Sequence, residues 1–168
     1  MSIQQNLEHI LSRIRAAELR AGRPAGSVRL VAVSKTFPAE DVKACHDAGQ
    51  RIFGENKVQE GLAKIPSLPP DTEWHLIGPL QRNKVRKALE YFTLIHAVDS
   101  LRLARFIDTV AQERGKRPRT AFPPAVALRS PILSQRRRRA SYMEKQQHTG
   151  KEHTKRDTLT VQTTSFLL

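Results

Sequence analysis

The sequence predicts an α/β protein built on part of a (β/α)8 barrel of the TIM type. Short apolar runs alternate with amphipathic segments through residues 1–115, and glycine, proline or polar residues separate them. Strands that are apolar throughout are buried on both faces, so this alternation is typical of a parallel sheet covered by helices. Four such units follow one leading helix, and a whole barrel needs about 250 residues. The pattern therefore predicts about half a barrel.

The first part of this region contains the leading helix and two strand–helix units. The apolar side chains of residues 3–21 recur on one helical face, and Gly22 and Pro24 end that helix. Pro38 and Gly49 lie where the first and last turns of the second helix are expected. The expected elements are strand 30–33, helix 39–48, strand 51–53 and helix 57–65.

Two more units complete the regular region. Gly78 and Pro79 close the third strand, Asp99 or Ser100 is expected to cap the last helix, and Gly115 stops it. The expected elements are strand 74–77, helix 80–91, strand 94–98 and helix 101–114.

The composition changes abruptly after Gly115. Residues 1–115 carry 17 basic and 13 acidic residues, whereas residues 116–168 carry 12 basic and 3 acidic ones, including four consecutive arginines at 136–139. Such a segment buries too little apolar surface to offset the entropy cost of ordering. We therefore expect two parts: residues 1–115 as the N-terminal half of the barrel, and residues 116–168 as a basic, disordered tail. A frameshift that joined an out-of-frame tail would explain the change.

Several protein classes are not expected from the composition. Cys45 is the single cysteine, so an internal disulfide is excluded. The first 20 residues lack the apolar core of a signal peptide, and no window approaches the roughly 20 apolar residues of a membrane span. We expect a soluble, cytoplasmic protein without a membrane partner. The histidines and Cys45 show no metal-ligand spacing, so no metal site is expected.

Three segments together carry a family resemblance: Val31–Thr36 (VAVSKT), Phe53–Glu60 (FGENKVQE) and Trp74–Lys84 (WHLIGPLQRNK). Their order and spacing resemble those of the pyridoxal phosphate homeostasis protein family, over roughly residues 1–115. The resemblance implies a fold-type III barrel, similar to the N-terminal domain of alanine racemase. It also implies a cofactor carrier or buffer without established turnover, so we expect a binding protein and not an enzyme.

The resemblance also implies the residues around the cofactor. Pyridoxal 5′-phosphate (PLP) would form a Schiff base with Lys35, Asn56 would lie beside it, and His75, Ile77 and Gly78 would line the same end of the barrel. No residue is expected to be catalytic.

The residues themselves allow a functional and a structural interpretation. Lys35 directly follows a buried strand, where ligands bind in this architecture, and a partly desolvated lysine attacks an aldehyde more readily; the alternative is an exposed lysine. Asn56 could contact the cofactor or cap the helix after it. Glu55 is interpreted as a first-turn acid favoured by the helix dipole. For His75, a hydrogen-bonded core residue is the preferred interpretation, and a catalytic role is the alternative.

The missing half of the barrel has consequences. In the family, late segments hold the phosphate and face the pyridine nitrogen, and these segments cannot be found here, so we expect weak or no cofactor retention. Exposed sheet edges favour self-association. The alternative functions are a basic adaptor that binds nucleic acid or acidic partners through residues 116–168, and a non-functional truncated product. Because no aromatic residues interleave with the arginines, nucleic-acid binding is not expected.

Overall fold

The structure is a computed structural model, and it describes residues 2–121 and 159–163. Its elements in chain order are α1 (Ile3–Arg20), β1 (Val28–Val33), α2 (Ala39–Asp47), β2 (Ile52–Glu55), α3 (Val58–Lys64), a 3-10 turn (Ile65–Ser67), β3 (Glu73–Leu76), a second 3-10 turn (Arg82–Lys84), α4 (Val85–Tyr91), β4 (Leu94–Ile95), α5 (Leu101–Glu113), β5 (Arg119–Thr120) and β6 (Leu159–Thr163).

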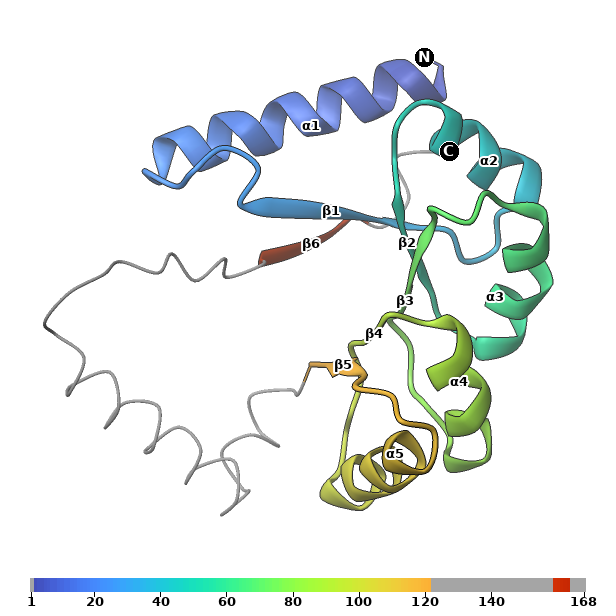
Figure 1. The fold of residues 1–168 in the computed structure, drawn as a ribbon. Coiled ribbons are helices and arrows are strands. Elements are labelled where there is room, and N and C mark those ends of the chain that lie inside the picture. The colour runs from blue at the N-terminus through green and yellow to red at the C-terminus, as the bar shows by residue number, and fades with distance from the viewer. Residues whose placement is uncertain (1, 122–158, 164–168) are drawn as a thin grey trace, which may run out of the picture.

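The strands form one parallel sheet in the order β5-β4-β3-β2-β1-β6. Helices α2, α3 and α4 follow one another along one side of this sheet (Figure 1). Sequential strands lie side by side from β1 to β5, as in a (β/α) barrel, because each helix returns the chain to the same edge of the sheet. The carboxyl ends of these strands therefore meet at one edge.

The hydrophobic core lies between the sheet and its helices. The rings of Phe53 and Trp74, on neighbouring strands, lie 5.9 Å apart at their centroids. Each large apolar side chain buried there contributes about 1.5–3 kcal/mol to the free energy of unfolding. Fully buried members of this core include Leu7, Val42, Leu76, Val85, Ile95, Val98 and Val110. The opposite face of the sheet, which we call the inner face, carries polar side chains such as His75 together with apolar ones such as Val31.

Two polar side chains fix the start of the sheet. Buried Glu18 in α1 accepts hydrogen bonds from the backbone N–H groups of Val28 (2.7 Å) and Gly26 (3.0 Å). These bonds, led by that of Val28, hold the pKa of Glu18 below its usual value. Gln50 donates from Nε2 to the carbonyl oxygens of Leu30 (2.9 Å) and Ile52 (2.6 Å) and so joins β1 to β2. The leading helix and the first two strands are thus fixed together.

The predicted α/β class is confirmed, with differences in detail. The helix expected over 80–91 begins only at Val85, because residues 82–84 form a 3-10 turn. The strand expected over 94–98 is the two-residue β4. Ser100 caps α5 as expected, since its Oγ accepts a hydrogen bond from the N–H of Leu103.

Two short segments after residue 115 are described as strands. Residues 119–120 pair with β4 as β5, and residues 159–163 pair with β1 as β6. β5 follows α5 and so continues the alternation of strands and helices seen in the earlier units. The N–H of Ala121 donates to Ile95 O (2.8 Å). Residues 122–158 and 164–168 lie outside the described residues. The domain boundary after residue 115 therefore stays a prediction.

Candidate cofactor site at the carboxyl edge

The pairing register places three of the predicted site residues at one edge of the sheet. Val33 pairs with Gly54, and Gly54 pairs with His75. Two residues further along these strands lie Lys35, Asn56 and Ile77. Hydrogen bonds continue toward this edge, from Ser34 N to Gly54 O (3.0 Å) and from Ile77 N to Glu55 O (2.9 Å). The end of β1 thus lies beside the ends of β2 and β3.

Lys35 is half-buried in the turn that directly follows β1. The N–H of Phe37 donates to Ser34 O (3.2 Å) and closes this turn. Between them Thr36 has φ 69°, and it is the single non-glycine residue with positive φ in the described part of the chain. This left-handed conformation costs roughly 1–2 kcal/mol for a side chain with a Cβ. Within the described residues, the Lys35 amine has no hydrogen-bond or ion-pair partner.

Close backbone packing brings Asn56, Ile77 and Gly78 together. A Cβ on Gly78 would lie 2.3 Å from the carbonyl oxygen of Asn56, and a Cβ on Gly54 would lie 3.1–3.2 Å from side-chain atoms of Val31 and Ile77. Only glycine fits at position 78 without movement of the backbone. The loops after β2 and β3 are therefore held against each other.

The capping interpretation of Asn56 is wrong. Lys57 occupies the N-cap position of α3, and no side-chain hydrogen bond caps this helix. The cap lies one residue later than expected because β2 continues to Glu55 and leaves Asn56 in the loop. The Asn56 side chain is half-buried and is not used in capping.

A hollow of about 650 Å³ lies next to these loops. Polar and apolar residues from the segments after β2 and β3 line it: Asn56, Lys57, Val58, Gln59, Glu60, Pro79, Gln81 and Lys84. The ion pair between Lys57 and Glu60 (2.9 Å) raises the pKa of Lys57. Lys35 does not line this hollow. The structure thus brings Asn56 into it, beside Gly78, and places Lys35 on the neighbouring strand end.

A buried ionic group lies beneath the Lys35 turn, and the sequence reasoning missed it. Glu55 is fully buried at the end of β2, where its Oε1 accepts from Ser34 Oγ (2.8 Å) and Lys64 Nζ (2.6 Å). The interpretation of Glu55 as a first-turn acid of α3 is wrong, because this residue belongs to the strand. Period-2 alternation was the available signal, since Phe53 and Glu55 share one face of the strand.

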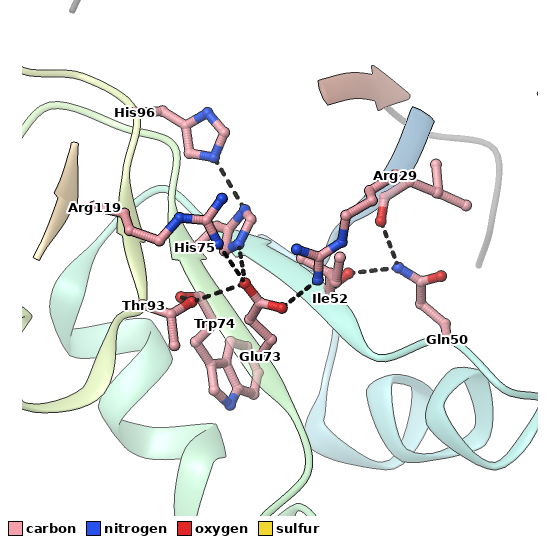
Figure 2. Close-up of polar contacts among 10 residues, drawn as sticks. Arg29, Gln50, Ile52, Glu73, Trp74, His75, Thr93, His96 and Arg119 are labelled. Carbon is pink, nitrogen blue, oxygen red and sulfur yellow. Dashed lines mark hydrogen bonds and ion pairs between the residues drawn. The ribbon is translucent and has the colours of Figure 1, made fainter. Parts of the chain in front are cut away.

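His75 belongs to a different environment, on the inner face (Figure 2). It is 3% exposed and lies between Glu73 Oε1 (3.0 Å from its Nε2) and His96 Nε2 (3.1 Å from its Nδ1). Glu73 also forms ion pairs with Arg29 and with Arg119, the latter at 3.7 Å. A hollow of about 430 Å³ borders His75 and His96. The contribution of His75 to cofactor binding stays a prediction.

The electrostatics of this network define its protonation. Burial lowers the pKa of His96 to about 4, assisted by His75, and burial also lowers the pKa of His75. Burial would raise the pKa of Glu73, but hydrogen bonds from His75 and Arg29 hold it below its usual value. Both histidines are therefore neutral at pH 7. His75 then donates from Nε2 to Glu73 and accepts at Nδ1 from His96, which leaves Nδ1 of His96 unprotonated.

The described residues contain neither a candidate membrane span nor a candidate metal site. None of the helices there is long and apolar enough to cross a membrane. Within the same residues, no group of three or more histidine, cysteine, aspartate or glutamate side chains could hold a metal ion.

Comparisons with known proteins agree on one relationship. No protein-family model matches the chain. A pyridoxal phosphate homeostasis protein of Vibrio alginolyticus is 49% identical over 109 residues, which cover 62% of this chain and 47% of that protein. The solved structure of PipY from Synechococcus elongatus, with PLP bound, is 39% identical and superposes with a TM-score of 0.61, covering 87% of this chain and 65% of PipY.

A more distant structure supports the fold alone. Alanine racemase from Streptomyces coelicolor is 21% identical and superposes with a TM-score of 0.51, covering 80% of this chain and 39% of the racemase. The chain spans about half the length of the curated relatives it matches. The N-terminal part of this chain is therefore similar to the pyridoxal phosphate homeostasis proteins, and its fold is part of the predicted (β/α) barrel.

Proposed function

We propose that this chain binds pyridoxal 5′-phosphate covalently through Lys35 and acts as a carrier or buffer of the cofactor. The observation that carries the proposal is the position of Lys35, half-buried and without a partner in the described residues, at the carboxyl edge of the parallel sheet. PipY, a 39% identical protein, has been solved with PLP bound, and curated relatives are named for PLP homeostasis. No finding favours the basic adaptor over this reading.

The residues at the edge fit such a cofactor. PLP supplies an aldehyde, whose carbon bonds to a lysine nitrogen while the aldehyde oxygen leaves as water. Lys35 provides that amine, and the half-buried Asn56 amide can donate and accept hydrogen bonds beside it. Lys84 provides positive charge in the adjoining hollow, which suits an anionic phosphate, whereas the charge of Lys57 there is paired with Glu60. The tight contact of Gly78 with Asn56 holds these loops in place.

Weak retention of the cofactor stays an expectation from the sequence. We further propose a cytoplasmic location, two parts divided after residue 115, and self-association through the β5 edge of the sheet, whose other edge strand is β6. Binding to nucleic acid is not part of the proposal.

Borohydride trapping tests the assignment of Lys35. The full chain is mixed with PLP, reduced with borohydride and digested, and the modified lysine is identified by peptide mapping. The expected result is a label on Lys35 that disappears in Lys35→Met. The matched control is Lys87→Met, which removes an exposed lysine from α4 and should leave the label unchanged. A label spread evenly over exposed lysines, or no label at all, would refute the proposal.

A further inference from the structure

The side chains of Glu55 and Lys64 form a closed hydrogen-bonded ring with the hydroxyl and the backbone carbonyl of Ser34, directly under the Lys35 turn. Lys64 Nζ, from the last turn of α3, donates to Glu55 Oε1 (2.6 Å) and to Ser34 O (2.6 Å). Ser34 Oγ donates to the same Glu55 oxygen (2.8 Å). We call Ser34, Glu55 and Lys64 the Glu55 cluster. It joins β1, β2 and α3 at the point where β1 ends.

Stability alone is a poor explanation for the Glu55 cluster. Glu55 is fully buried, and Lys64 has a side chain that is 11% exposed, so both charges have lost most of their hydration. Burying an ion pair in this way often stabilises a fold less than packed hydrophobic side chains would. In addition, Glu55 Oε2 has no hydrogen-bond partner among the described residues. An unsatisfied buried oxygen is costly, and such groups call for an explanation beyond packing.

The Glu55 cluster acts on the backbone that carries Lys35. The carbonyl oxygen of Ser34, which belongs to the peptide bond preceding Lys35, accepts from both Lys64 Nζ and the N–H of Phe37. The N–H of Ser34 donates to Gly54 O, so every polar group of Ser34 is bonded. The next residue after Lys35, Thr36, is held in the strained left-handed region. Strain of this kind persists only where surrounding bonds over-determine the conformation.

We propose that Ser34, Glu55 and Lys64 are positioning residues: through the Ser34 carbonyl they hold the strained turn that presents the Lys35 amine at the carboxyl edge. The inference rests on the proposed function of Lys35. Within this arrangement the two lysines have separate roles. Lys64 is engaged by two acceptors, whereas Lys35 has none in the described residues and is available to an aldehyde.

The test replaces the buried pair by apolar side chains of similar size, Glu55→Leu with Lys64→Met. Because hydrophobic replacement of a buried ion pair is often neutral or stabilising, the double variant should fold and keep its melting temperature. The matched control is Lys43→Met with Asp47→Leu, which removes an exposed ion pair of α2 (2.7 Å). A more conservative variant, Glu55→Gln, keeps the size of the side chain and serves if the double variant does not fold.

Two readouts are taken on each variant. The first is hydrogen exchange of the Phe37 amide without cofactor, which reports the bond to Ser34 O directly. The second is the ratio of borohydride-trapped PLP on Lys35 to that on Lys87, which an intact fold with a purely structural cluster would not change. In the double variant we expect the Phe37 amide to exchange about tenfold faster and the Lys35 to Lys87 labelling ratio to fall about tenfold. Glu55→Gln should show smaller changes in the same directions. A factor of about ten corresponds to the loss of one hydrogen bond. The control should match the wild type.

The outcomes separate the inference from the proposed function. If both Glu55 variants show the Phe37 exchange rate and the Lys35 to Lys87 labelling ratio of the wild type, the positioning role is overturned and the proposed function of Lys35 still stands. Absence of any Lys35 label in the wild-type chain would overturn the proposed function. In that case, faster Phe37 exchange in the variants would still show that the cluster holds the turn, and unchanged exchange would overturn that as well.

Discussion

The neutral histidine network on the inner face predicts a loss of stability in mild acid. His96 has a folded-state pKa of about 4, against about 6.5 in an unfolded chain. Its pKa is lowered on folding, so protonation favours the unfolded state. The contribution is complete above pH 6.5 and is lost as the pH falls through the window from 6.5 toward 4.

The magnitude follows from these two values. Between pH 7.5 and pH 5, linkage with pKa values of 6.5 and 4 gives a loss of about 2 kcal/mol in the free energy of unfolding. His96 is partly exposed, so solvent screening reduces this to about 1 kcal/mol. In a chain of marginal stability, this is a measurable fraction of the total.

Urea unfolding at pH 7.5 and pH 5 checks this prediction. The variant His96→Gln can still donate an amide N–H toward His75 Nδ1 but cannot be protonated. We expect the acid-induced loss to be about 1 kcal/mol smaller in His96→Gln than in the wild type, whereas the exposed His9→Gln on α1 should behave as the wild type. An identical pH dependence in all three proteins would refute the reasoning.

Two further predictions concern packing. Gly78→Ala should lower the free energy of unfolding by about 1–3 kcal/mol and reduce trapping at Lys35, because its Cβ would lie 2.3 Å from the carbonyl oxygen of Asn56; an unchanged melting temperature would show that the loops separate freely. Burial raises the pKa of the Cys45 thiol to about 11, so at pH 8 Cys45 should react with a thiol reagent at least tenfold more slowly than in urea-unfolded protein. Equal rates of reaction would contradict the buried position of Cys45.

Local pattern predicted the order and type of the elements from α1 to α5. Amphipathic periodicity and boundary residues such as Pro38, Gly49 and Gly115 are local features of the sequence. They can therefore be recognised without knowledge of the fold. The strands β5 and β6 were not predicted. A two-residue strand such as β5 has no periodicity of its own, and its existence depends on the partner strand β4.

The candidate site also has one feature that the sequence predicted and others that it did not. The position of Lys35 followed from one rule, that ligands bind beyond the carboxyl ends of parallel strands. The interpretations of Asn56 as a helix cap and of Glu55 as a first-turn acid were wrong, because β2 extends to Glu55 and the N-cap is Lys57, whereas the cofactor contact of Asn56 stays a prediction. A difference of one or two residues at a strand end turned an expected surface acid into a fully buried one.

The amino-acid sequence by itself determined the α/β alternation, the strand that precedes Lys35 and the relationship to PLP-binding proteins. The tertiary structure alone decided the partners: Lys64 against Glu55 and Ser34, and Arg29 against Glu73, which is 44 residues away. The physical reason is that side chains alternate between the two faces of a strand, so a shift of one residue in register reverses which of them meet. Register is established when strands from distant parts of the chain pair, and no local pattern encodes it.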